Sequence, residues 1–311
     1  MHPDKRDHPK IKAGLHPRNL HLERYDFEVL TGCWPELSNF VTKNKFGDLS
    51  IDFFDPKAVK TLNRSLLKYF YGMDYWDIPD GYLCPPVPGR ADYLHHLADL
   101  LASCNNGKIP VGSQVRCLDI GVGANCIYPI LGNRVYGWSF VGSDIDPAAI
   151  QNAGKLVDEN PVLTNGGIEL RIQPNREDIF NHLVQPGEYF DLVLCNPPFH
   201  ASPSAAQSGS VRKIVHLKQK KIGSPVLNFG GTANELWCPG GEERFIGKMI
   251  AESSQWRRSV GWFTVLVAMS KHLPGIYHAL KMADATEVRT IGMSQGHKSS
   301  RIVAWRYSVS R

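Results

Sequence analysis

Apolar residues beyond position 89 fall into short runs that alternate with stretches of helical spacing. The stretches with helical spacing lie at 91–104, 125–131, 148–157 and 177–183. The apolar runs have the length of strands and lie at 114–120, 138–143, 167–172, 189–195, 259–269, 287–292 and 301–308. Strands that alternate with helices are typical of an α/β fold, in which helices cover a parallel sheet. We therefore predict a mostly parallel sheet of seven strands, closed by a C-terminal pair.

Residues 1–88 follow a different pattern. Apolar side chains recur on one face of a helix expected over 56–70. A proline-rich string at 84–89 disfavours helix and is typical of a stiff linker. We predict a helical, basic N-terminal extension of residues 1–88, followed by a second unit of residues 89–311. Within that unit the segment at about 200–239 fits no element, and we interpret it as a basic insert that is either functional or disordered.

Composition adds limits to this picture. The 311 residues are 42% hydrophobic, which suits a globular protein with a sizeable core. The first 24 residues are polar, and the longest apolar run, at 262–269, is too short to cross a bilayer. We therefore expect a cytoplasmic protein without membrane contact. Seven scattered cysteines without a CxxC pair, and twelve histidines without an HExxH array, indicate neither a disulfide framework nor a metal site.

The formal net charge of +5 is unevenly distributed along the chain. Two stretches, 200–234 and 295–311, contain basic residues and no acidic ones, and the N-terminus is basic as well. Clustered positive charge favours a nucleic-acid partner, although either stretch alone could equally be a solvated surface. The candidates for contact with that partner are Arg18, Arg212, Lys213, Lys218, Lys220, Lys221, Lys298 and Arg301.

A glycine turn follows the first strand of the expected sheet and opens a helix. Glycines in such a turn let a nucleoside ligand approach the backbone, although a tight strand-to-helix connection would look the same. Cys126 stands where a dinucleotide fingerprint has its third glycine, so a ligand without a pyrophosphate is favoured over NAD or FAD. The candidates for contact with the ligand are Asp119, Gly121, Gly123 and Asn125.

Charged residues near the turn complete a candidate ligand site. Asp144 ends the second strand, about twenty residues beyond the turn, where a carboxylate can accept hydrogen bonds from ribose hydroxyls. Asp146 precedes Pro147 and is better explained as a helix N-cap, although it stays a possible substitute. Arg90 can supply a bidentate countercharge to a ligand carboxylate, or can be a surface residue at a helix start.

Asn196-Pro197-Pro198-Phe199 directly follows the fourth strand, so it should border the same crevice. The Asn196 side chain and the Pro197 carbonyl can accept hydrogen bonds from both N–H groups of an aromatic amine, which localises its lone pair for attack on a methyl donor. Phe199 offers a face on which an extruded base can stack. A proline-rich stop with a packing phenylalanine is the plain alternative.

Longer strings resemble the family of adenine-N6 RNA methyltransferases typified by the bacterial large-subunit ribosomal RNA methyltransferase F, which has a eukaryotic relative acting on a small nuclear RNA. The resemblance covers most of the chain. It is carried by 14–19, 76–81, 83–93, 119–129, the Asn196 tetrapeptide, 227–231, Glu235-Leu236-Trp237-Cys238, 295–301 and Ala304-Trp305.

This resemblance implies a class I methyltransferase fold with a Rossmann-like sheet, S-adenosylmethionine as methyl donor and S-adenosylhomocysteine as product. Arg90, Gly121, Asp144 and Asn196 would then contact the cofactor or the target amine. The implied substrate is one adenine of large-subunit ribosomal RNA, either free or in an assembly intermediate, with no obligate protein partner. Relatives carry glutamate where Asp144 stands, so Asp146 remains open for the ribose.

Two other interpretations stay open. The same chemistry could serve another RNA, a DNA adenine or a protein glutamine, and the basic insert argues only against a small neutral amide. The chain could also be a non-catalytic RNA-binding scaffold, against which the intact turn, carboxylate and tetrapeptide speak. A nicotinamide oxidoreductase is disfavoured by Cys126 and by the absence of a plausible proton donor beside the turn.

Overall fold

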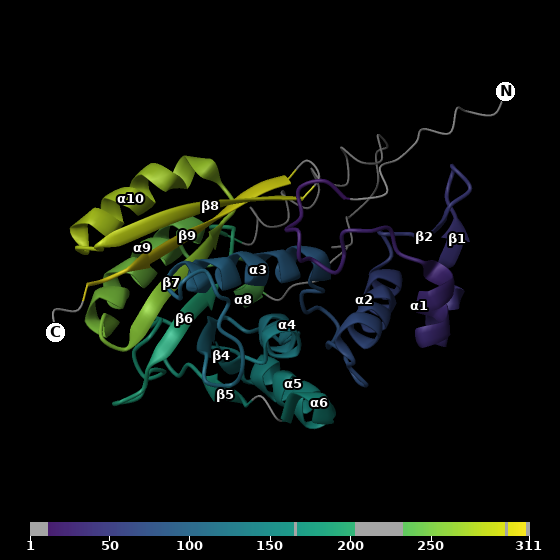
Figure 1. Ribbon diagram of the computed structural model, residues 1–311, viewed down its shortest axis with the longest axis horizontal. Coiled ribbons are helices and arrows are strands. Elements are labelled where there is room, and N and C mark those ends of the chain that lie inside the picture. Colours follow the sequence, from purple (N-terminus) through teal and green to yellow (C-terminus); the bar gives the residue numbers. More distant parts are fainter. Residues whose placement is uncertain (1–11, 165–166, 203–232, 296–297, 309–311) are drawn as a thin grey trace.

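A seven-stranded sheet forms the centre of the computed structural model, which describes residues 12–164, 167–202, 233–295 and 298–308 (Figure 1). The strand order is β5-β4-β3-β6-β7-β9-β8. Neighbours from β5 to β7 pair in parallel, and β9 runs antiparallel to both β7 and β8. The strands are β3 (Arg116–Ile120), β4 (Ser139–Asp144), β5 (Ile168–Ile172), β6 (Phe190–Cys195), β7 (Val260–Val267), β8 (Glu287–Gln295) and β9 (Lys298–Arg306). This is the class I methyltransferase arrangement, so the predicted α/β fold is confirmed.

Helices cover both faces of the sheet. They are α3 (Val87–Ser103), α4 (Ile127–Tyr136), α5 (Pro147–Asp158), α6 (Pro161–Thr164), α8 (Ala233–Leu236), α9 (Gly241–Ser253) and α10 (Leu273–Met282), with short 3-10 turns η2 (Ser254–Trp256) and η3 (Ser270–His272). Alternate residues of β6 enter different cores: Leu192 and Leu194 belong to the cluster with α3 and α4, whereas Val193 and Cys195 belong to that with α9 and α10. This period of two is why the central strands are mostly apolar on both faces.

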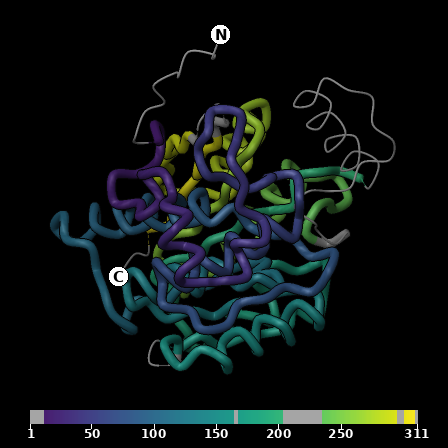
Figure 2. The backbone as a smooth tube through the Cα atoms, turned by 90° about the vertical axis from the view of Figure 1, so that its right-hand side faces the viewer, coloured from purple at the N-terminus to yellow at the C-terminus, as the bar shows by residue number. Residues whose placement is uncertain are grey.

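The N-terminal part contains α1 (Phe27–Cys33), η1 (Pro35–Asn39), β1 (Val41–Lys43), β2 (Leu49–Ile51) and α2 (Pro56–Tyr71). It lies at the end of the molecule that Figure 2 turns toward the viewer. The expected helix at 56–70 is confirmed, but an antiparallel hairpin of β1 and β2 accompanies the helices. Leu62, Leu66 and Trp76 share one core with the sheet residue Leu192, so this extension is not packed separately.

Two local expectations are wrong. The proline-rich string does not remain a linker, because α3 begins at Val87, and Pro88 occupies its first turn, where no intrahelical N–H bond is lost. The helix expected at 177–183 does not form: these residues make turns, and the N–H groups of Ile179 and Phe180 bind the Glu252 carboxylate instead. The predicted boundary after residue 88 falls inside α3, and a separate RNA-binding task for residues 1–88 stays a prediction.

Within the described residues, no helix is long and apolar enough to cross a bilayer. The same residues bring together no group of three or more histidine, cysteine, aspartate or glutamate side chains that could hold a metal ion.

Candidate active site

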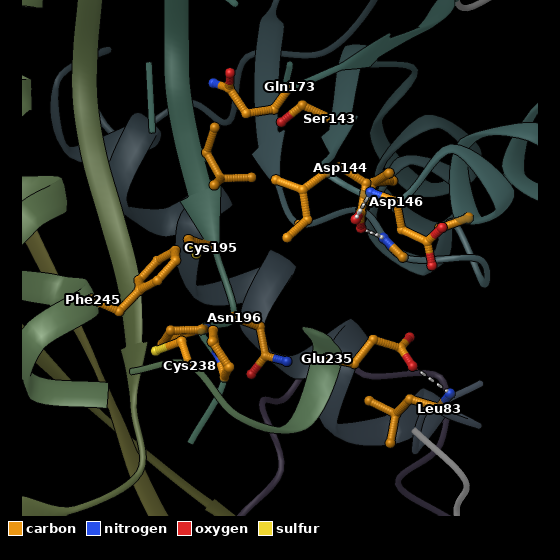
Figure 3. A pocket seen from close by; sticks show the side chains of 18 of the residues that line it. Leu83, Ser143, Asp144, Asp146, Gln173, Cys195, Asn196, Glu235, Cys238 and Phe245 are labelled. Carbon is orange, nitrogen blue, oxygen red and sulfur yellow. Dashed lines mark hydrogen bonds between the residues drawn. The ribbon is translucent and has the colours of Figure 1, made fainter. Parts of the chain in front are cut away.

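A cavity of about 340 Å³ opens at the carboxyl ends of four neighbouring strands (Figure 3). Its walls come from the segments that follow β3, β4, β5 and β6, namely 121–123, 144–146, 173–179 and 196–198. Parallel strands end at the same edge of a sheet, so motifs far apart in the sequence meet there. The glycine turn, the two carboxylates at the end of β4 and the Asn196 tetrapeptide therefore border one cavity, as predicted.

The glycine turn is fixed to the end of β4 by backbone hydrogen bonds. Gly121 and Val122 donate their N–H groups to the Ser143 carbonyl oxygen at 2.9 and 2.8 Å. Gly123 has a φ of 64°, and a Cβ atom there would lie 3.1 Å from the Asn125 side-chain nitrogen. The conformation and the close approach both require glycine, which leaves the backbone open to the cavity.

Asp144 and Asp146 have different tasks. Asp144 accepts the N–H of Gly123 at 3.0 Å, which holds its side chain at the turn, and burial raises the pKa of this carboxyl group. Asp146 is the N-cap of α5: it accepts the N–H of Ala148 at 3.0 Å, and the Tyr82 hydroxyl donates to its other oxygen at 2.7 Å. The predicted cap is confirmed, and Asp144 is the better candidate for a ribose.

Arg90 and Asp119 are buried ionisable residues close to the site. Arg90 lines the cavity and donates to the Tyr128 hydroxyl at 2.8 Å, while its Nε atom has no partner in the described part of the chain. Asp119 is fully buried behind the lining, and neither carboxylate oxygen has a hydrogen-bond partner among the described residues. Burial raises the pKa of Asp119 well above its usual range, with Arg90 opposing that shift. Direct contact of Asp119 with a cofactor stays a prediction.

Asn196 enters the cavity from the end of β6. Its Oδ1 atom is buried and lacks a hydrogen-bond partner within the ranges that the structure describes. Behind it, the Tyr93 hydroxyl lies 2.9 Å from Thr264 Oγ1, which donates to the Val193 carbonyl at 2.8 Å, so α3 and β7 brace the strand. A buried acceptor without a donor is costly, by about 1–3 kcal/mol, and a ligand N–H group relieves that cost.

The other residues of the tetrapeptide differ in whether they line the cavity. Pro197 and Pro198 line the cavity, whereas Phe199 is half-buried and is not among the lining residues. Aromatic walls come instead from Trp237 and from Phe245 of α9. A stacking role for Phe199 therefore stays a prediction without support from this geometry.

Asn125 also has a structural task, since its Oδ1 accepts the N–H of Ile127 at the start of α4. It lines the cavity as predicted for a cofactor contact.

Sequence reasoning missed lining residues at the C-terminal end of the basic insert, where α8 (Ala233–Leu236) forms although no element was expected. Glu235, Trp237 and Cys238 line the cavity beside Asn196, and Figure 3 shows Glu235, Asn196 and Asp144 around the same space. The string Glu235-Leu236-Trp237-Cys238 supported the family resemblance but suggested no chemical role. Only the chain's return to the sheet edge brings these side chains to the site.

The predicted nucleic-acid contacts have mixed positions. Arg18 donates to Asp99 at 2.8 Å and to the His95 carbonyl at 2.9 Å, so it fastens the N-terminal segment to α3. Arg301 is half-buried in β9, and the backbone of Lys298 begins that strand. The remaining candidates lie outside the described residues: Arg212, Lys213, Lys218, Lys220 and Lys221.

Comparisons with known proteins bear on the whole chain. A family model described as RNA methyltransferase matches residues 9–309. The ribosomal RNA large subunit methyltransferase F of Cytophaga hutchinsonii is 52% identical over 304 residues, which cover 98% of this chain and 94% of that protein. Its counterpart in Serratia proteamaculans is 54% identical, over 97% of this chain and 90% of the relative.

Solved structures agree with these relatives. The hMettl16 catalytic domain in complex with MAT2A 3'UTR hairpin 6 has a TM-score of 0.78 and 28% identity, covering 96% of this chain and 98% of that one. The N-terminal domain of human METTL16 in complex with SAH has a TM-score of 0.74 and 26% identity, covering 95% and 99%. Because the family match spans nearly the whole length, this chain belongs to the family of S-adenosylmethionine-dependent RNA methyltransferases.

Proposed function

We propose that this protein methylates the N6 amine of one adenine in large-subunit ribosomal RNA and releases S-adenosylhomocysteine, the methylated nitrogen losing one proton to water. The observation that carries this proposal is the buried, unpartnered Oδ1 of Asn196, which shares a cavity with the glycine turn and Asp144. The naming of two relatives as ribosomal RNA large subunit methyltransferase F supports the substrate class. The substrate is free ribosomal RNA or an assembly intermediate in the cytoplasm, and no obligate protein partner is part of the proposal.

The residues present fit S-adenosylmethionine. Arg90 offers a buried guanidinium with an unpartnered Nε to the α-carboxylate, and the open backbone at Gly121 and Gly123 allows close approach. Asp144, held by Gly123, accepts from the ribose hydroxyls. When bound, the cofactor supplies a methyl group on an electron-poor sulfonium sulfur. The chain's part is to orient this group and to exclude water from it.

The target amine is positioned by acceptors at the end of β6. The lone pair of the adenine N6 atom is delocalised into the ring, so the amine is a poor nucleophile until its hydrogens are held. Asn196 Oδ1 and the Pro197 carbonyl accept these two hydrogens, and the prolines fix φ so that both acceptors keep their places. Orientation and a preorganised polar environment then supply most of the rate enhancement.

We assign RNA binding to the basic side chains of the insert. It carries Arg212, Lys213, Lys218, Lys220 and Lys221, and its C-terminal end includes the cavity-lining residue Glu235. Phosphate contacts by such side chains hold an RNA without reading its bases, and they weaken with salt. Lys298 and Arg301 extend the same proposal, whereas Arg18 is committed to α3.

Methyl transfer to matched RNA and DNA oligonucleotides, with large-subunit ribosomal RNA from cells that lack this gene as the full substrate, tests the proposal. Wild-type protein should form N6-methyladenosine at one site in RNA, as mapped by mass spectrometry of nuclease fragments. Asn196→Ala should lower kcat by about 100-fold or more while keeping the urea unfolding midpoint, since it deletes an acceptor that acts on the reacting nitrogen. Transfer to DNA alone, or near wild-type turnover by Asn196→Ala, contradicts the proposal.

A further inference from the structure

Glu235 joins two segments of the cavity wall that are distant in sequence. Its Oε2 atom accepts the N–H of Leu83 at 3.0 Å, in the segment just before α3. Its Oε1 atom lies at the glycine turn, 3.3 Å from where a Cβ on Gly123 would stand. Figure 3 shows the Leu83 contact at the rim of the space that Asn196 also borders. The Leu83 bond fixes the rotamer, so this carboxylate is held at the turn before any ligand binds.

The other carboxylates that line the cavity stand at different places along its wall. Asp144 ends β4 and accepts the N–H groups of Gly123 and Asp146, and Asp146 caps α5 and accepts from the Tyr82 hydroxyl. Glu177 and Asp178 follow β5, at the far edge of the four strands that form the site. Glu235 is therefore the lining carboxylate, among the described residues, that lies between the glycine turn and the segment leading to Arg90.

The amino-acid end of the methyl donor is a zwitterion. In the proposed site Arg90 binds the α-carboxylate, and the α-ammonium group needs an acceptor of opposite charge nearby. Asp119 is a weak candidate, because it lies behind the lining and its full burial favours the neutral acid. The Glu235 carboxylate is half-buried and already oriented by a backbone N–H, so it loses little conformational entropy and little hydration when it binds a cation.

We propose that Glu235 binds the α-ammonium group of S-adenosylmethionine and of its product, opposite the α-carboxylate held by Arg90. This assignment rests on the proposed function, which supplies the identity of the methyl donor. It also links cofactor binding to the basic insert, because α8 lies in the C-terminal part of that insert. The residue contacts cofactor and takes no part in the methyl transfer itself.

Calorimetry with two ligands tests this proposal without relying on turnover. S-Adenosylhomocysteine carries the α-ammonium group, whereas 5′-methylthioadenosine keeps the nucleoside and sulfur but lacks the amino-acid end. Glu235→Gln preserves an oxygen acceptor for the Leu83 N–H and removes the charge. It should raise the Kd for S-adenosylhomocysteine by about tenfold and leave that for 5′-methylthioadenosine unchanged. Glu243→Gln is the matched control, because Glu243 is exposed on α9 and does not line the cavity, and it should change neither Kd by more than about twofold. Glu177→Gln tests the lining carboxylate after β5 as a rival site.

Three results would overturn the assignment, provided that the urea midpoint of Glu235→Gln matches wild type. Equal weakening of both ligands would mean that Glu235 shapes the cavity and does not read the ammonium group. Unchanged affinity for both, with a lower kcat/KM for RNA, would assign Glu235 to the substrate. Weakening of S-adenosylhomocysteine alone by Glu177→Gln would move the ammonium site to the β5 edge. Failure of the wild-type protein to bind either ligand would instead contradict the proposed function itself.

Discussion

Glu252 lies outside the cavity but stabilises one of its walls, and its removal should lower the free energy of unfolding measurably. The side chain is 8% exposed, and its carboxylate accepts the N–H of Ile179 at 2.9 Å and that of Phe180 at 2.9 Å. Residues 177–183 form turns, so these N–H groups have no helical partners. Ile179 lines the cavity. Glu252 is thus a positioning residue that connects α9 to the cofactor site.

The size of the effect follows from the two donors. Glu252→Ala leaves two buried backbone N–H groups without an acceptor, at about 1–3 kcal/mol each, and the free energy of unfolding should fall by about 3 kcal/mol. For a chain of this length that corresponds to a drop of about 5 °C in Tm. Glu252→Gln should lie between Ala and wild type, because its amide oxygen can still accept while its NH₂ group faces an N–H.

Equilibrium urea unfolding and calorimetry with S-adenosylhomocysteine measure the two consequences together. The loosened loop should raise the Kd for the cofactor product severalfold, since Ile179 loses its anchor. Glu243→Ala is the control, because Glu243 is exposed on the first turn of the same helix and should change stability by less than about 1 kcal/mol. A midpoint for Glu252→Ala equal to that of Glu243→Ala would refute the reasoning.

Two further predictions concern buried titratable groups. Burial lowers the pKa of His21 to about 3 and that of His95 to about 4, so the unfolded chain binds these protons near pH 6.5 and the fold does not. The contribution of these histidines to the free energy of unfolding should be fully present above about pH 6.5 and should decline as the pH falls toward 4. A urea midpoint that stays constant from pH 7 to 5.5 speaks against this. Asp144→Ala should raise the Kd for S-adenosylhomocysteine by about tenfold or more, whereas Asp146→Asn keeps the cap oxygen and should have a smaller effect; equal losses would remove the ribose assignment from Asp144.

Local sequence pattern was sufficient for the sheet and for the motifs at its edge. Each of the seven strands lies within about two or three residues of its predicted position. Central strands such as β7 are nearly continuous apolar runs because they are buried on both faces, whereas the edge strand β5 alternates apolar and charged residues. The glycine turn, Asp144 and Asn196 follow strands directly, so parallel topology alone brings them together. The Asp146 cap was readable from Pro147, since an N-cap is a local interaction.

Contacts between distant segments were beyond local pattern. The apolar residues at 177–183 have the spacing of a helix, but the segment forms turns. Glu252, more than seventy residues away, accepts hydrogen bonds from its backbone N–H groups. The hairpin of β1 and β2 has strands of three residues, too short for a period of two to be visible. Arg18 lies in a basic segment, which is typical of a nucleic-acid contact. Its guanidinium group is instead bound by Asp99 on α3.

The sequence by itself therefore determined the fold class and the positions of the glycine turn, Asp144 and Asn196 at the ends of strands, since these depend on neighbours in the chain. The tertiary structure alone decided that Glu235 and Trp237 close the cavity and that Phe199 does not line it. The physical reason is that those positions depend on how the chain returns to the sheet edge after the basic insert, and periodicity and propensity carry no information about that path.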